Sequence, residues 1–187
     1  MKSLPTGLPG LIVIEPAIHR DERGWFQETY RHDAFHALGI RDDFVQDNHS
    51  RSARGVLRGL HFQVGDRPQA KLVRCARGAI FDVAVDIRRG SPTYGQWEGW
   101  ILNDQQGRQL YCPIGFAHGF VVLTDIADVV YRCSDYYDPA GDSGVRFDDE
   151  AVAVEWPGGP HIVSERDAKA PTLAECEPNL PFVWNGA

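Results

Sequence analysis

The residues best suited to chemistry cluster in the segment 56–63, which reads Val-Leu-Arg-Gly-Leu-His-Phe-Gln and is followed by a lysine at position 71. His61 lies between apolar residues, and Arg58 and Lys71 supply two cations close to it in sequence. A neutral imidazole can remove a proton near pH 7, and an ammonium group can stabilise an oxyanion that develops beside it. A hydrogen-bonded core histidine with an exposed arginine and lysine would show the same pattern, so both interpretations stand at this point.

Later in the chain, three other residues have side chains that could complete such a site. His118 lies among glycines and aromatic residues in the segment 113–120, which suits a tight turn or the wall of a pocket. Tyr131 would share one face of a strand with Val129 and Cys133, and it fits either a core tyrosine or a proton donor. Asp167 by itself would be interpreted as an acid at a helix start or on the surface.

The surroundings of His61 do not match a metal site. Metal-binding jelly rolls commonly use a His-x-His pair on one strand face, with a carboxylate a few residues on. Two residues after His61 the chain has Gln63, and the nearest acid is Asp66 in a polar stretch. The cysteines form no CxxC pair and indicate buried reduced thiols; they are Cys75, Cys112, Cys133 and Cys176. We therefore expect no metal and no disulfide.

The elements that position these residues are predicted to be mostly strands. Side chains alternate clearly over residues 80–87, and short apolar runs recur at intervals of about 8–12 residues. Further strands are expected at residues 11–14, 25–30, 97–102, 108–112, 120–123 and 129–133, with hairpin loops at 103–107 and 124–128. The stretch 32–40, closed by Gly39, is helix-like. The pattern predicts one all-β domain over residues 1–187, a sandwich or jelly-roll barrel, with loops and short helical turns after Pro139.

Composition and charge exclude several classes of function. The net charge is −7 and no basic run occurs, which argues against nucleic-acid binding, although a few arginines can still hold one small anionic ligand. No apolar run approaches the roughly 20 residues of a membrane helix. Residues 1–10 lack the apolar core of a signal peptide, so we expect a cytoplasmic protein without membrane association.

Taken together, six segments of the chain resemble the dTDP-4-dehydrorhamnose 3,5-epimerase family. They occur in family order and cover nearly the whole sequence; they are residues 20–26, 46–50, 57–63, 115–120, 131–137 and 164–171. The resemblance implies a cupin-type jelly roll, a homodimer, no cofactor and a dTDP-linked nucleotide-sugar substrate.

The resemblance also implies a role for each matching residue. His61 corresponds to the catalytic base, Asp167 to the carboxylate that orients it, Lys71 to the cation near the sugar ketone, and Tyr131 to the acid on the opposite ring face. Arg58 corresponds to a ligand of the diphosphate. The nucleotide-side positions, some of them supplied by the partner subunit, are Arg23, Phe26, Glu28, Gln46, Asn48 and Tyr137. His118 matches a family site histidine without an assigned role.

The reaction implied is inversion of C3 and C5 beside a C4 ketone, through proton removal and reprotonation from the other face. A mono-epimerase acting only at C3 or only at C5 would need the same groups, so the sequence does not separate these activities. The 3,4-ketoisomerases share the fold class but match these motifs less well. A metal-dependent cupin would need ligands that the sequence does not offer. A non-catalytic sugar-binding jelly roll would be expected to lack the base, the acid and the lysine together.

Overall fold

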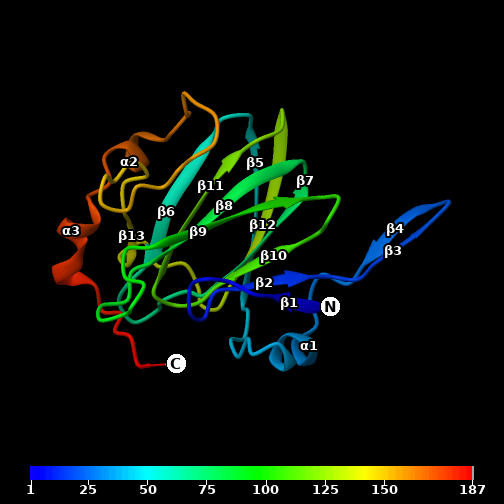
Figure 1. The fold of residues 1–187 in the computed structure, drawn as a ribbon, viewed down its shortest axis with the longest axis horizontal. Helices are drawn as coiled ribbons and strands as arrows, with labels where there is room; N and C mark the ends of the chain where they lie inside the picture. The colour runs from blue at the N-terminus through cyan, green and yellow to red at the C-terminus, as the bar shows by residue number, and fades with distance from the viewer. Residues whose placement is uncertain (187) are drawn as a thin grey trace.

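Two antiparallel β-sheets packed face to face form the body of the protein, and the computed structural model describes residues 1–186 (Figure 1). The six-stranded sheet has, in spatial order, β1 (Lys2–Leu4), β2 (Ile12–Glu15), β10 (Gln109–Cys112), β7 (Lys71–Arg77), β12 (Ile126–Cys133) and β5 (Gln46–Ala53). The five-stranded sheet has β13 (Asp142–Gly144), β6 (Leu57–Gln63), β11 (Phe116–Val122), β8 (Ala79–Asp86) and β9 (Trp97–Asn103). The predicted cupin-type jelly roll is confirmed.

The main core lies between the two sheets. Val73 and Val129 from the six-stranded sheet pack in one cluster with Ala84 and Phe120 from the five-stranded sheet. Because side chains alternate along a strand, the residues between them point to the outer faces. A polar residue at an inward-facing position of a strand therefore also points between the sheets. Such positions can place the groups of a site in the interior.

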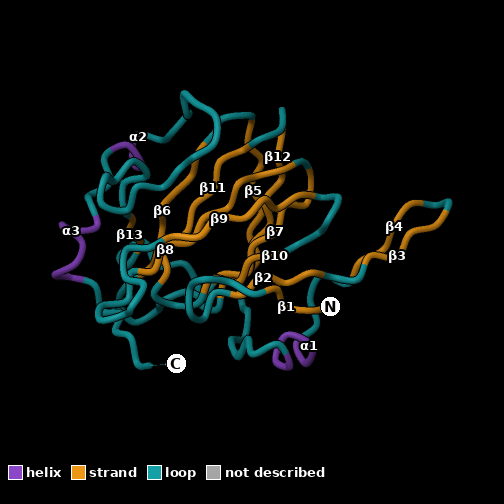
Figure 2. The backbone as a smooth tube through the Cα atoms, in the orientation of Figure 1, coloured by secondary structure: helices purple, strands orange, loops and turns teal. Residues whose placement is uncertain are grey.

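The chain after β12 covers the outer face of the five-stranded sheet. Val83 and Val85 of β8 pack there against Val145 and Leu180 of this segment. Apart from β13 it consists mainly of loops with short helical turns (Figure 2). The turns are α2 (Glu165–Ala168), α3 (Leu173–Cys176) and the 3-10 turn η1 (Glu177–Asn179). The prediction of loops and short helical turns after Pro139 is confirmed, and this layer explains why β8 is buried on both faces.

The two predicted hairpins are wrong. β9 pairs with β8 in the five-stranded sheet, whereas β10 pairs with β2 and β7 in the other sheet. β11 and β12 are separated in the same way. Residues 103–107 and 124–128 thus connect one sheet to the other. Alternation within a strand shows that it is half-buried, but it carries no information about which strand lies beside it.

A hairpin and a short helix stand outside the sandwich. β3 (Ile18–Asp21) pairs only with β4 (Gly24–Gln27), and this hairpin extends away from the body at the right of Figure 1. The helix α1 (His32–Ala37) is shorter than the predicted stretch 32–40, because the chain turns at Gly39, whose φ is +95°. No helix in the described part of the chain is long and apolar enough to cross a membrane.

Candidate active site

A cavity of about 280 Å³ opens between the two sheets and contains most of the predicted chemical groups. His61 enters it from β6 of the five-stranded sheet, while Lys71 from β7 and Tyr131 from β12 enter from the six-stranded sheet. The other residues that line it are Gln46, Asn48, Phe62, Gln63, Gln69, Tyr137, Asp142 and Arg166. The base, cation and acid suggested by the sequence therefore surround one space.

His61 is held by a buried carboxylate. Its Nε2 lies 2.7 Å from Oδ1 of Asp167, a residue 106 positions away in sequence. Asp167 sits in the short turn α2, where its backbone NH donates to Oγ of the N-cap Ser164 at 3.0 Å. Burial alone would raise the pKa of Asp167, but the hydrogen bond and the charge of His61 outweigh it and leave that pKa below its usual range. An ionised carboxylate accepts a hydrogen bond from the protonated Nε2, so Nδ1 of His61 remains free as a base.

Lys71 and Tyr131 are buried enough for their acid–base properties to change. Nζ of Lys71 reaches across the barrel to the backbone oxygen of His61 at 3.4 Å. Burial lowers the pKa of Lys71. Burial raises the pKa of Tyr131, so the phenol keeps its proton at neutral pH and can donate it. His61 thus lies on one wall of the cavity, and Lys71 and Tyr131 lie on the opposite wall.

His118 has a different environment from His61. It is the cross-strand partner of His61 in the ladder between β6 and β11, but it does not line the cavity. Its Nε2 lies 2.8 Å from Oδ1 of the fully buried Asp82. Burial raises the pKa of Asp82, and the charge and hydrogen bond of His118 oppose that rise. The structure thus places His118 in a buried pair beside the site.

Part of the predicted nucleotide set lies at the mouth of the cavity. Gln46 Nε2 donates to Oδ1 of Asn48 at 3.2 Å, and Gln46 Oε1 accepts from the backbone NH of Tyr137 at 2.9 Å. Arg58 lies in a neighbouring opening of about 350 Å³ that also contains His61 and Asp167. Arg58 is exposed and donates only to Ser52 Oγ, at 3.0 Å, so its guanidinium is available to an anion.

The remaining predicted residues lie away from the cavity. Arg23 and Phe26 are on the β3–β4 hairpin and line a separate, open hollow of about 490 Å³ together with Trp25. Glu28 follows the hairpin and pairs with Arg31 at 3.4 Å. None of these side chains lines the cavity within residues 1–186. One copy of the chain therefore does not bring together all residues that the sequence assigned to the site.

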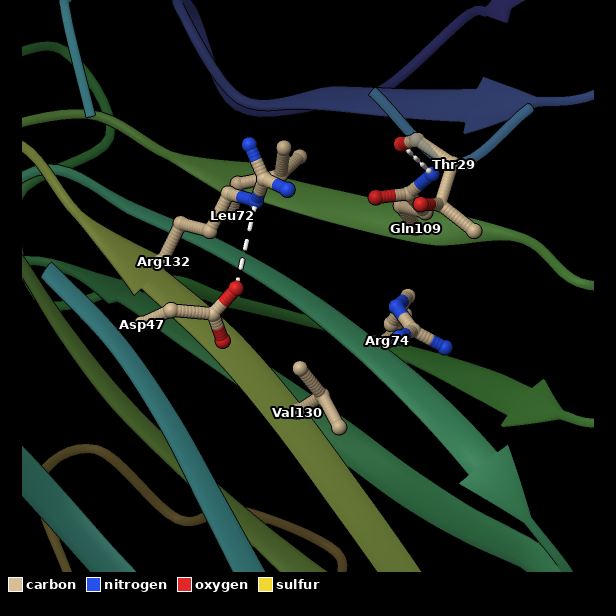
Figure 3. Close-up of a pocket in the computed structure, with 7 residues that line it drawn as sticks. All are labelled: Thr29, Asp47, Leu72, Arg74, Gln109, Val130 and Arg132. Atoms are coloured by element: carbon tan, nitrogen blue, oxygen red, sulfur yellow. Dashed lines mark hydrogen bonds and ion pairs between the residues drawn. The ribbon is translucent and has the colours of Figure 1, made fainter. Parts of the chain in front are cut away.

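A further small hollow, of about 20 Å³, lies on the outer face of the six-stranded sheet (Figure 3). It is lined by Thr29, Asp47, Leu72, Arg74, Gln109, Val130 and Arg132. Leu72 and Val130 are the sequence neighbours of Lys71 and Tyr131, so they point to the opposite side of the same strands. Arg132 pairs there with Asp47 at 3.5 Å. A volume of about 20 Å³ holds little more than one water molecule, so we place no substrate in this hollow.

Comparison with known proteins decides the family. The family model described as dTDP-4-dehydrorhamnose 3,5-epimerase matches residues 5–175. The chain belongs to this family. A dTDP-4-dehydrorhamnose 3,5-epimerase of Salmonella typhimurium is 49% identical over 173 residues, which are 91% of this chain and 94% of that protein. A dTDP-4-dehydrorhamnose 3-epimerase of Streptomyces niveus is 45% identical over 94% of this chain and 85% of that protein.

A solved structure agrees over almost the whole length of this epimerase-family chain. The dTDP-6-deoxy-D-glucose-3,5-epimerase of Legionella pneumophila, solved with dTDP-4-keto-L-rhamnose, superposes with a TM-score of 0.95. The two sequences are 45% identical, and the match covers 99% of each chain. The fold and the family are therefore shown by sequence and by structure independently.

Sequence reasoning missed several residues of this family member's cavity. Arg166 directly precedes Asp167 and pairs with Asp142 at 2.7 Å, and both line the cavity. The position of Arg166 beside the acid was a usable signal, since α2 carries both residues. Asp142 gave none, because it acquires its partner only when distant segments meet.

Proposed function

We propose that this chain is a dTDP-4-dehydrorhamnose 3,5-epimerase, which inverts C3 and C5 of a dTDP-linked 4-keto-6-deoxy sugar. The observation that carries the proposal is the single cavity lined by His61, Lys71 and Tyr131, with Asp167 bonded to His61 behind it. The names of the relatives in Salmonella typhimurium and Legionella pneumophila support the substrate class.

In the proposed reaction, Nδ1 of His61 takes the proton from a carbon beside the C4 ketone, and the electron pair of the C–H bond forms an enolate. Asp167 accepts the hydrogen bond from Nε2 and stabilises the imidazolium that results. The ammonium group of Lys71 stabilises the developing negative charge on the ketone oxygen. The enolate charge favours the protonated lysine and thereby offsets the effect of burial on its pKa.

Tyr131 completes the inversion by giving its phenolic proton to the same carbon from the opposite face. The carbon then has the inverted configuration and the ketone is restored. His61 releases its proton to water and the Tyr131 phenolate takes a proton from water, which returns both groups to their starting states. All four roles are filled by side chains of this chain, with no change of oxidation state. We accordingly expect no cofactor in the reaction.

The number of carbons inverted is the point that needs an experiment. The 3-epimerase of Streptomyces niveus is about as similar as the 3,5-epimerases, so a C3-only activity is the second candidate. Incubation with dTDP-4-keto-6-deoxyglucose in deuterated buffer, followed by NMR, separates the two. The proposal predicts deuterium and inversion at both C3 and C5. Exchange confined to C3 would replace it with the mono-epimerase.

We further propose that the protein works as a homodimer in which the β3–β4 hairpin of one copy reaches the cavity of the other. Support comes from the exposed aromatic side chains Trp25 (53%) and Phe26 (70%), which an isolated hairpin would leave in water. Arg23, Phe26 and Glu28 lie away from the cavity of their own chain. In the proposed dimer they would contact the cavity of the second copy. We expect light scattering to give the mass of a dimer. A fully active monomer at nanomolar concentration would rule out a shared site. We also expect the protein to be cytoplasmic.

A further inference from the structure

The helix α1 and the segment after it bring two histidines and an aspartate together, outside the cavity. His32 and His36 are four residues apart, so they project from the same side of the helix. Their ring centroids are 4.0 Å apart. Nε2 of His32 lies 2.9 Å from Oδ1 of Asp43. One ligand atom from each of the three residues lies within 4.8 Å of the other two.

We propose that His32, His36 and Asp43 form a binding site for a divalent transition-metal cation such as Zn²⁺. Two imidazoles and a carboxylate are a donor set that suits zinc, nickel and copper. Mg²⁺ and Ca²⁺ prefer oxygen ligands only, so this donor set excludes them. With metal–ligand bonds of about 2.0–2.1 Å, tetrahedral geometry places ligand atoms about 3.3 Å apart. The three ligand atoms lie within 4.8 Å of one another, and His32 Nε2 and Asp43 Oδ1 are 2.9 Å apart, so side-chain adjustment is needed to reach that spacing.

The backbone around this group is held in place by packing, whereas the side chains of His32 and Asp43 are exposed and can adjust. Phe35, between the two histidines in sequence, is buried and packs against Tyr30 with ring centroids 5.0 Å apart. The backbone NH of Ile40 returns to the oxygen of Phe35 at 3.1 Å, and this turn brings residue 43 back to the helix. The His32 and Asp43 side chains are 56% and 79% exposed, so they can close on a cation without disturbing the core.

His36 supplies an independent sign that the group is not saturated. Its Nε2 is buried, and no atom of residues 1–186 forms a hydrogen bond with it. A buried polar atom without a partner carries a desolvation cost. A cation coordinated by this nitrogen would supply the missing partner. The exposed His49, by contrast, belongs to no such group in the described part of the chain.

A cation at this site would act on the fold. It would tie α1 to the segment 41–45, which leads directly into β5, and β5 carries Gln46 and Asn48 to the cavity. A ligand that binds the folded chain alone stabilises it by mass action. The site takes no part in the proposed epimerisation, so removal of its metal should leave turnover unchanged. The surroundings of His61 still predict no metal in the cavity, because this site lies at α1.

Isothermal titration calorimetry with ZnCl₂ tests the proposal on untagged, chelator-treated protein. We expect one site per chain with micromolar affinity and a rise in melting temperature on zinc addition. His32→Ala and His36→Ala should each weaken binding by an order of magnitude or more, and Asp43→Asn should weaken it less. The matched control is His49→Ala, which removes an exposed histidine 3.8 Å from Asp128 and should leave binding unchanged.

Two results would overturn the proposal. The first is the absence of zinc binding by the wild-type protein below millimolar concentration. The second is wild-type affinity in the folded His32→Ala and His36→Ala variants, which would place the metal elsewhere. Circular dichroism establishes folding of each variant, and turnover measured in parallel should not change, so failure of this site leaves the proposed epimerase activity unaffected.

Discussion

At the scale of single residues, the partner of each histidine decides what its imidazole can do. His61 and His118 are neighbours in the β6–β11 ladder, and each is bonded through Nε2 to a buried aspartate. The His61 side chain is 28% exposed and faces the cavity, whereas that of His118 is 8% exposed. A base must reach substrate, so the proposed proton transfer belongs to His61 and the structural pairing to His118.

Substitution of the base and of the acid should give different labelling patterns. His61→Ala should abolish both deuterium exchange and inversion, because no enolate forms. Tyr131→Phe should lose inversion while exchange persists at a substrate carbon, since His61 still removes a proton and returns one to the same face. General acid–base groups contribute about 10²–10⁴-fold, so NMR in deuterated buffer detects either loss.

Each of these variants must be shown to fold, because a half-buried side chain also contributes packing. Near-normal exchange in folded His61→Ala would mean that another group is the base. Inversion at the normal rate in Tyr131→Phe would transfer the acid role to water or to Tyr136 or Tyr137, which lie nearby in sequence.

Arg58 should contribute to binding more than to the chemical step. Its exposed guanidinium lies beside His61 and is free for a diphosphate. Arg58→Ala should remove a charged hydrogen bond worth about 1.5–3 kcal/mol, which weakens nucleotide-sugar affinity about 10- to 150-fold. Arg51→Ala is the control, because Arg51 pairs with Asp128 on the outer face. Unchanged affinity with collapsed turnover would assign Arg58 to the chemical step.

At the scale of elements, one close approach between strands sets the position of both histidines. β6 and β11 meet at Gly59 and Gly119, where the register of the ladder shifts. A Cβ on Gly59 would lie 2.5 Å from the Cα of Gly119, and the φ of Gly59 is +139°. Only glycines allow the two backbones to come so close, and the contact lies two residues before His61 and one after His118.

Gly59→Ala should therefore destabilise the fold by about 2 kcal/mol or more, through both the contact and the backbone conformation. Gly24→Ala separates the two causes, because Gly24 on the hairpin has a φ of +125° and no atom within 4 Å of the position that a Cβ would occupy. Urea unfolding measures both variants. If the two lose equal stability, backbone strain alone accounts for the effect and the strand contact contributes nothing.

At the scale of the whole molecule, the projecting hairpin divides the site between two copies in the proposed dimer. A mixture of two inactive variants tests this division. His61→Ala removes the base from one cavity, and Arg23→Ala removes a hairpin residue. A random 1:1 mixture should contain about half mixed dimers, each with one intact site, and regain about a quarter of wild-type activity. No recovery after subunit exchange would show that each hairpin serves its own chain.

Turnover should survive chelation. His61 is the only histidine among the residues that line the described cavity, and the one acid there, Asp142, is paired with Arg166. This donor set does not fit a divalent metal, and the histidine pair on α1 lies outside the cavity. Dialysis against a chelator should leave the rate unchanged while lowering the melting temperature if zinc was bound. Activity that vanishes and returns with one added metal would contradict the proposed chemistry.

The sequence by itself indicated the all-β class and the loops and short helical turns after Pro139, and it proposed His61, Lys71 and Tyr131 as the central residues. Alternation over residues 80–87 reports burial, which is a local property, and the segment around His61 carries its chemistry in adjacent letters. Six segments in family order were sufficient to indicate the family, and Gly39 correctly indicated the end of α1.

Only the tertiary structure decided which of these parts meet. The partners of β9 through β12, the pairing of His61 with Asp167 and of His118 with Asp82, and the distance of the hairpin from the cavity all depend on contacts between segments far apart in sequence. The physical reason is that hydrophobic patterning specifies the face that a strand buries, whereas strand order and side-chain pairing follow from the global packing of two sheets.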